Sequence, residues 1–181
     1  MNLTNGSGIL KKTCLVSFFM SMLITNGYTQ SSMENKTNKA ASDTTPKVTG
    51  IGGIFFFTDN PKETSAWYRN NLGIDTNEYG SSFESRNINK PEEVNILQWS
   101  PFKTGSAYFA PSKKEFMINY RVQNIEGLVE KLKANGVTIV DSIETFEYGK
   151  FVHVMDGDGN KLELWEPIDS SLTPKDGTTT K

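Results

Sequence analysis

Two residues near the C-terminal end of the sequence could carry out acid–base chemistry together. His153 is the only histidine of the chain, and Glu163 follows ten positions later in the stretch FVHVMDGDGNKLELW. A histidine and a carboxylate that share a pocket can move a proton on or off a bound carbonyl compound without a metal ion. We therefore predict Glu163 and His153 as the catalytic residues if the protein is an enzyme, a question that the sequence leaves open.

Both residues also have a purely structural interpretation. A lone histidine on an apolar strand is more often a hydrogen-bonded structural residue in the wall of a pocket than a catalytic residue. Glu163 could pair with Arg121 or Lys161 and take no part in chemistry. Burial beside Trp165 would instead remove water from the carboxylate and raise its pKa, which is one way to make a base that works near neutral pH.

The strands that carry the two residues decide whether they meet. We expect strands at residues 151–155 and 161–166, joined by the turn-rich segment 156–160. Side chains alternate between the two faces of a strand, so a shift of one residue in the pairing moves every side chain to the opposite face. The pairing between His153 and Glu163 thus depends on the turn, and the sequence does not fix it.

The body of the chain, residues 49–168, repeats one order of elements twice. The expected strands are 51–58, 75–79, 82–86 and 94–100 in the first half, and 115–122, 137–143, 151–155 and 161–166 in the second. A helix follows the first strand of each half. Asp59 or Asn60 can cap the first helix and Gly73 can end it, while Asn135 and Gly136 end the second. Strand, helix and three strands, twice over, predict a duplicated α+β fold with a cup for a small ligand.

Composition excludes some classes of partner. The chain has 181 residues, 36% of them hydrophobic, and a formal net charge of -2. It contains no run of basic residues interleaved with aromatic ones, so nucleic acid is not expected as a partner. Within residues 1–30, a basic pair precedes an apolar run from Thr13 to Ile24. Twelve residues of helix span roughly 18 Å, too short for a membrane core of about 30 Å.

These blocks predict the organisation of the whole chain. Residues 1–30 have the order of a secretory signal peptide, so we expect an exported protein, periplasmic or secreted, without a membrane span. Residues 31–48 have almost no apolar surface and are expected to form a flexible linker. Residues 169–181 are expected to form a disordered tail.

Several stretches of this body resemble a known family. They are Gly52–Phe56, Asp59–Pro61, Ala66–Gly73, Phe116–Val122 and Met155–Pro167. Together they resemble the glyoxalase/bleomycin resistance/dioxygenase, or vicinal oxygen chelate, superfamily. The resemblance implies two βαβββ modules that form an open eight-stranded barrel, a cup, with the helices outside. It also implies a homodimer. Members include isomerases, dioxygenases, thiol transferases and proteins that only sequester drugs, so the resemblance alone does not define the activity.

The same resemblance argues against a metal ion. Metal-dependent members place a histidine early in the first strand and another at the start of the fifth, and the matching positions here are Gly53 and Met117. Glu163 matches the glutamate that completes many of these metal sites, whereas the fourth strand offers only Gln98 or Trp99. A metal site needs three or four donors. We predict no cofactor and no metal; if a divalent metal were bound, Glu163 and His153 would be its ligands.

Aromatic and polar residues on the expected cup strands define a candidate ligand pocket. We predict the following ligand-binding residues: Gly53, Phe55, Phe57, Met117, Asn119, Tyr148, Phe151 and Trp165. Such a pocket suits a small planar or hydrophobic molecule. Two alternatives remain open. One is a metal-dependent lyase, isomerase or dioxygenase of the same superfamily. The other is a non-catalytic interaction domain, which predicts no interior pocket around Glu163.

Overall fold

A computed structural model describes residues 43–173 of the chain. The expected signal peptide and most of the expected linker lie outside these residues. Within them, no helix is long and apolar enough to cross a membrane. The elements are β1 (Lys47–Thr58), α1 (Pro61–Leu72), β2 (Ser81–Asn87), β3 (Lys90–Lys103), the 3-10 turn η1 (Ala107–Phe109), β4 (Phe116–Gln123), α2 (Ile125–Ala134), β5 (Glu144–Phe146), β6 (Gly149–Met155), β7 (Lys161–Pro167) and α3 (Asp169–Leu172).

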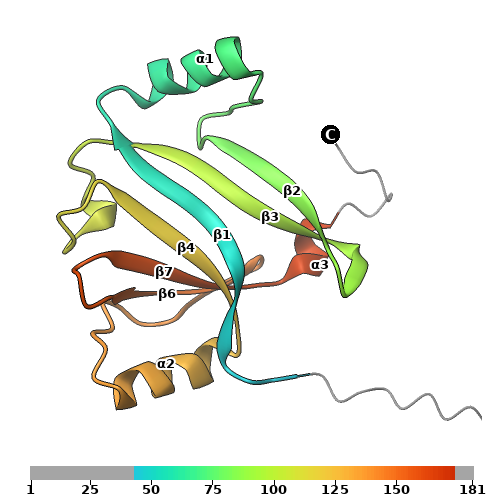
Figure 1. The fold of residues 1–181 in the computed structure, drawn as a ribbon, viewed down its shortest axis with the longest axis vertical. Coiled ribbons are helices and arrows are strands. Elements are labelled where there is room, and N and C mark those ends of the chain that lie inside the picture. The colour runs from blue at the N-terminus through green and yellow to red at the C-terminus, as the bar shows by residue number, and fades with distance from the viewer. Residues whose placement is uncertain (1–42, 174–181) are drawn as a thin grey trace, which may run out of the picture. The chain divides into compact units, whose positions relative to one another are not determined.

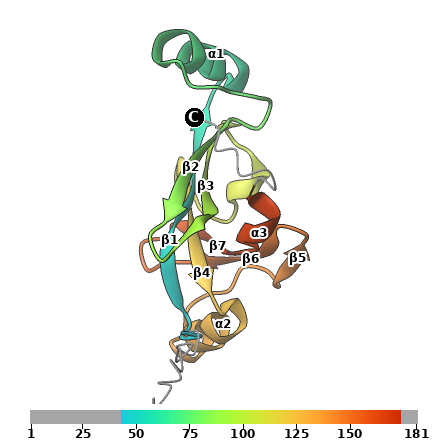
Figure 2. The ribbon, with the colours of Figure 1, turned by 90° about the vertical axis from the view of Figure 1, so that its right-hand side faces the viewer.

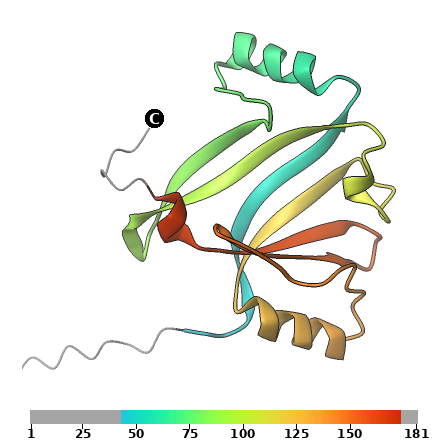
Figure 3. The same cartoon turned by 180° about the vertical axis from the view of Figure 1, so that it is seen from behind.

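The strands form one mixed sheet that does not close. Its order is β2-β3-β1-β4-β7-β6-β5 (Figures 1 and 3), with β2 and β5 at the two edges. The two halves of the chain pair in the same way. The first strand of each half, β1 or β4, lies parallel to the last strand of that half, β3 or β7, and β1 and β4 pair antiparallel in the middle.

The α+β class is confirmed, but the expected number of eight strands is wrong for residues 43–173, which contain seven. The segment expected as a strand at 75–79 makes only one isolated bridge, from Asn77 to Gly80. Asn77 also accepts a hydrogen bond from the Tyr79 backbone N–H at 2.8 Å, which makes this segment a local turn. The segment expected at 137–143 likewise makes one bridge, and a short strand follows it at β5.

Both long helices lie against the same face of the sheet, which we call the outer face. Asn60 caps α1 by accepting a hydrogen bond from the Glu63 N–H, and Gly73 ends the helix with φ 70°, as the sequence predicts. The ring of Tyr68 on α1 contacts Trp99 of β3 at 4.7 Å between centroids. On the second half, α2 buries its apolar side against outer-face residues of the sheet: Val122, Val152, Val154 and Leu164.

The opposite, inner face carries the residues of functional interest. We define it as the face with Asn119, Arg121 and Glu163. In Figure 2, which views the sheet from its side, η1 and α3 lie on the same side of β1 and β4. Their contacts agree, because Tyr108 of η1 reaches Glu163 and Asp169 of α3 reaches Arg121. Five aromatic or apolar residues fill part of this face: Phe55, Phe57, Phe102, Phe109 and Met117.

Two ends of this region differ in detail from the expected boundaries. β1 begins at Lys47, within the segment expected as linker. The first residues of the expected tail form α3, and Thr173 next to it accepts a hydrogen bond from the Val94 N–H of β3 at 3.1 Å. Figures 1 and 3 both show α3 beside the hairpin end of β2 and β3. Residues 174–181 lie outside the described residues.

Candidate functional site

One row of paired residues crosses five strands. Gln98 of β3 pairs with Gly53 of β1, and Gly53 pairs with Asn119 of β4. Asn119 pairs with Glu163 of β7, and Glu163 pairs with His153 of β6. The β6–β7 register that the sequence leaves open therefore brings His153 and Glu163 to the same face of the sheet.

His153 lies between two carboxylates. Its Nε2 is 3.0 Å from Glu163 Oε2, and its Nδ1 is 2.6 Å from Asp141 Oδ2. The backbone N–H of His153 also donates to Asp141 Oδ1 at 2.8 Å. Asp141 comes from the segment between α2 and β5, so a loop fixes the orientation of the imidazole. A carboxylate that holds one ring nitrogen in this way leaves the other nitrogen directed at its partner.

Glu163 is only 3% exposed and receives two further hydrogen bonds. Asn119 Nδ2 donates to Glu163 Oε1 at 2.5 Å, and the Tyr108 hydroxyl donates to Glu163 Oε2. Lys161 Nζ in turn donates to the Tyr108 carbonyl at 2.6 Å, and Phe102 stacks on the Tyr108 ring. Tyr108 therefore covers the carboxylate, and the predicted alternative pairing of Glu163 with Arg121 or Lys161 is not made.

The environment favours the charged form of both residues, which corrects the expected rise in the pKa of Glu163. Burial raises the pKa of Glu163, but the hydrogen bonds from His153, Tyr108 and Asn119 outweigh it and hold the pKa below the ordinary 4.5. Burial lowers the pKa of His153, but the hydrogen bond and charge of Glu163, with Asp141, bring it above the ordinary 6.5. Burial and the charge of Glu163 also raise the pKa of Tyr108. Glu163 is thus an acceptor with its donors in place.

The residues at the positions implied for a metal do not fit one. Gly53 has no side chain, Met117 is fully buried, and the Gln98 amide donates to Tyr79 O at 3.1 Å. Asn119 Oδ1 is a buried oxygen without a hydrogen-bond partner, and it is a single neutral donor. Within residues 43–173, no three His, Cys, Asp or Glu side chains are placed to hold a metal ion. A divalent ion needs more donors than this row supplies.

The eight predicted ligand-binding residues fall into three groups. Phe55, Phe57 and Met117 pack with Phe102 and Phe109 in an aromatic cluster. Gly53 and Asn119 belong to the row beside Glu163. Trp165, Phe151 and Tyr148 form an aromatic stack on the second half, in which the Trp165 and Phe151 rings are 5.7 Å apart. Tyr148 at the end of this stack is 41% exposed, whereas Phe55, Met117, Asn119 and Trp165 are buried.

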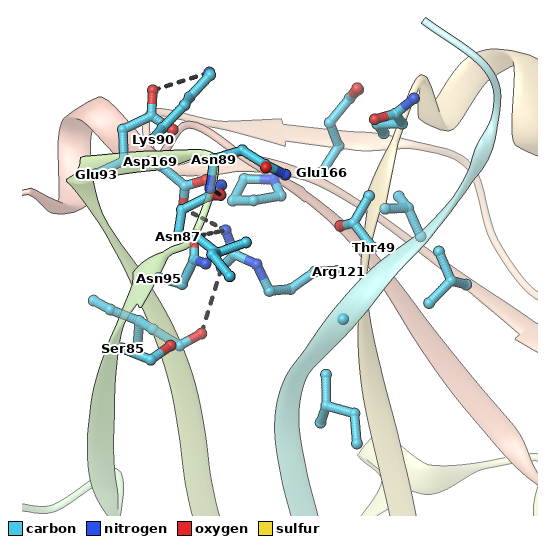
Figure 4. A pocket seen from close by; sticks show the side chains of 18 of the residues that line it. Thr49, Ser85, Asn87, Asn89, Lys90, Glu93, Asn95, Arg121, Glu166 and Asp169 are labelled. Carbon is cyan, nitrogen blue, oxygen red and sulfur yellow. Dashed lines mark hydrogen bonds and ion pairs between the residues drawn. The ribbon is translucent and has the colours of Figure 1, made fainter. Parts of the chain in front are cut away.

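The larger of two cavities in the described part of the chain lies away from Glu163. Two cavities of residues 43–173, of about 1050 and 520 Å³, are lined by other residues. The larger one, which we call the β1–β3 groove, opens because β1 and β3 pair only from Gly53 and Gln98 onward. Figure 4 shows it between the N-terminal part of β1 and the hairpin of β2 and β3. Its wall includes Ile51, Ser85, Asn95, Arg121 and Asp169.

Arg121 reaches across this opening from β4. Its Nη1 donates to the Ile96 carbonyl of β3 at 3.4 Å, and its Nη2 donates to Asn95 Oδ1 at 3.1 Å. Its side chain passes over β1 at Gly52, where an added Cβ would lie 3.1 Å from Arg121 Cγ. Arg121 also pairs with Asp169 of α3, as Figure 4 shows. The buried side chain of Arg121 thus lies in the groove.

Sequence reasoning missed three residues of these arrangements. Tyr108 and Asp169 lie outside the expected strands and helices, and Asp141 lies in the segment expected as a strand at 137–143. Only the folded chain brings them close to their partners, since Tyr108 is 55 positions from Glu163 in the sequence and Asp169 is 48 from Arg121. No local motif marks them. No pattern in the sequence predicts the contact of Asp141 with His153.

Comparison with known proteins identifies a family and a fold. The family model described as "Glyoxalase/Bleomycin resistance protein/Dioxygenase superfamily" matches residues 50–164. A search of curated proteins finds no match. A variant of methylmalonyl-CoA epimerase from Streptomyces coelicolor, solved with 2-nitronate-propionyl-CoA, is similar with a TM-score of 0.52 and 13% identity, over 67% of this chain and 99% of that chain. The epimerase from Mycobacterium tuberculosis gives 0.48 and 16%, over 76% and 98%. At these identities the likeness shows the fold alone.

Proposed function

The chain belongs to the glyoxalase/bleomycin resistance protein/dioxygenase superfamily, and we propose that it binds a small organic molecule, without a metal ion, in the β1–β3 groove. The observation that carries this proposal is the groove itself. Its volume of about 1050 Å³ is at the upper end of the range typical of small-molecule sites, roughly 300–1,000 Å³. Its wall combines exposed apolar side chains, such as Ile51, with a buried guanidinium from Arg121. Such a mixture gives a ligand both contact area and orientation.

The β1–β3 groove fits this role better than the surroundings of Glu163. Tyr108 and Asn119 occupy the space at that carboxylate and satisfy it. This arrangement is the one that the interaction-domain alternative predicts around Glu163. That alternative, however, leaves the groove without a ligand, and it predicts that no small molecule stabilises the protein.

A substitution that fills the groove tests the proposal. An added Cβ at Gly50 meets only Arg121 Cδ at 3.8 Å, so Gly50→Leu is expected to fold and to extend its side chain into the groove. Gly157→Leu is the matched control, because Gly157 has open space and lies outside the groove. Molecules from a chemical library that raise the melting temperature of the native protein should fail to do so in Gly50→Leu and succeed in Gly157→Leu. Equal shifts in both variants would contradict the proposal.

Proton transfer without a metal is the second candidate function, favoured by the chain of contacts from Asp141 through His153 to Glu163. In this candidate the pair removes a proton from the carbon next to a carbonyl group. It requires Tyr108 to move away from Glu163. Exchange of solvent deuterium into small ketones and α-keto acids, followed by NMR, should be faster with the protein than without it and should fall in His153→Gln. Equal rates with and without the protein would exclude the candidate.

Export and dimer formation belong to the same proposal. Residues 1–30 have the composition of a signal peptide, and members of the superfamily often form dimers. Mass spectrometry of the protein recovered from cells that carry the full sequence should show an N-terminus near residue 31. Light scattering of that protein should give twice the mass of one chain. An intact N-terminus or a monomer mass would remove the corresponding part of the proposal.

A further inference from the structure

Arg121 is held in place before any ligand is present. Its guanidinium lies 5.1 Å from the centre of the Trp165 ring, and it donates to Asn95 and to the Ile96 carbonyl. Gly52 leaves the room over β1 that its side chain needs. A guanidinium fixed in this way loses little further freedom when an anion binds to it.

The charge partner of Arg121 lies on the short helix α3. Asp169 pairs with Arg121 Nη2, and its side chain is 17% exposed, against 8% for Arg121. α3 has only four residues, and no side chain caps its N-terminus. α3 lies against β3, and Thr173 next to it accepts a hydrogen bond from the Val94 N–H. Glu166 is another acidic residue of the groove, but it already accepts a hydrogen bond from the Asn124 N–H at 2.5 Å.

We propose that the β1–β3 groove selects small organic carboxylates. The carboxylate of the ligand displaces the carboxylate of Asp169 and pairs with Arg121 instead. This inference rests on the proposed function and specifies its ligand class. The exchange keeps the buried guanidinium paired, which a neutral ligand cannot do, because an unpaired buried charge is strongly destabilising.

Asp169→Ala in the full chain tests the exchange by chemical rescue. The variant should melt at a lower temperature than the native protein, because Arg121 loses its counter-charge. Sodium acetate, propionate and benzoate should restore its melting temperature, whereas sodium chloride and the amides acetamide, propionamide and benzamide should not. The carboxylates should bind Asp169→Ala about tenfold more tightly than the native protein, in which Asp169 competes for the same place.

Further variants keep the test decisive. If Asp169→Ala does not fold, Asp169→Asn removes the charge and keeps the shape, and the same rescue is expected. Adding Arg121→Gln to either variant should abolish the difference between carboxylates and amides. If carboxylates and amides stabilise the protein equally, and Gly50→Leu removes this effect, the proposed displacement of Asp169 is wrong. The proposal that the groove binds small molecules would still stand. Rescue that is no larger in the variants than in the native protein would also overturn the proposed displacement.

Discussion

His153 and Glu163 lie directly opposite each other on β6 and β7, with His153 Nε2 3.0 Å from Glu163 Oε2. The surroundings raise the pKa of His153 and lower the pKa of Glu163, and the pair is largely shielded from water, since Glu163 is buried and Tyr108 covers it. A buried ion pair with its hydrogen bonds in place is costly to break, because either partner alone is left as an uncompensated charge. This relationship makes stability sensitive to pH.

We predict that the free energy of unfolding has a broad maximum between about pH 4.5 and 6.5 from this pair. The folded pKa of His153 is raised, so its contribution is complete below 6.5 and is lost as the pH rises through the folded pKa. The folded pKa of Glu163 is lowered, so its contribution is complete above 4.5 and is lost as the pH falls through the folded pKa. Urea unfolding at a series of pH values measures both limbs.

His153→Gln is the control for the alkaline limb. His153 is the only histidine in the sequence, so no other histidine can produce a loss of stability near neutral pH. The variant should show a flat dependence there. If the free energy of unfolding of His153→Gln still falls near neutral pH, another group causes the loss.

Tyr108→Phe should lower the free energy of unfolding by about 1–3 kcal/mol, since it removes a donor from a buried carboxylate. It should also raise the pKa of Glu163 and move the acid limb to higher pH. Tyr148→Phe is the matched control, because Tyr148 is as exposed as Tyr108, 41% against 40%, but does not donate to Glu163, and its effect should stay within about 0.5 kcal/mol. Equal effects of the two substitutions would show that the Tyr108 hydroxyl contributes nothing at Glu163.

Gly52→Ala should destabilise the protein, and Gly50→Ala should not. An added Cβ at Gly52 would lie 2.2 Å from Asn119 Oδ1 and 2.8 Å from Trp165 Cε3, whereas at Gly50 the nearest atom is 3.8 Å away. Overpacking of this kind costs about 1–3 kcal/mol. Urea denaturation of the two variants measures the difference. The same free energy for both would mean that Asn119 and Trp165 can move aside without cost.

Divalent metals should not change the stability of the purified protein. Glu163 already has its donors in place, and Gly53 and Met117 offer no ligand at the implied positions. Treatment with EDTA, and addition of zinc or manganese chloride, should shift the melting temperature no more than an equal ionic strength of sodium chloride. One tightly held metal ion per chain, measured by mass spectrometry after purification without chelator, would be the contrary result.

The sequence predicts the element types of this fold well, for physical reasons. Asn60 and Gly73 mark the ends of α1 because a cap and a left-handed stop are local properties of the chain. The strand expected at 75–79 fails because a turn at Asn77 satisfies its backbone locally, and alternation of residue types does not reveal that. Local signals thus identify elements more reliably than they identify pairing partners.

The candidate site is only partly predictable in this way. The place of Glu163 beside His153 depends on the register set by the β6–β7 turn, which strand alternation alone does not determine. The lowered pKa of Glu163 depends on hydrogen bonds from His153 and also from Tyr108 and Asn119, which come from other parts of the chain. The β1–β3 groove arises where two strands separate, and a sequence pattern carries no sign of that separation.

The side of β3 that faces the groove has no strand partner before Gln98, and the residues after Pro167 help to cover it. Thr173 accepts the Val94 N–H, and Arg121 donates to the Ile96 carbonyl, so these main-chain groups already have partners. Strand edges whose groups are free recruit further strands and lead to aggregation. A chain cut after Pro167 should therefore leave the Val94 N–H without its partner, and we expect it to aggregate more readily than the intact protein.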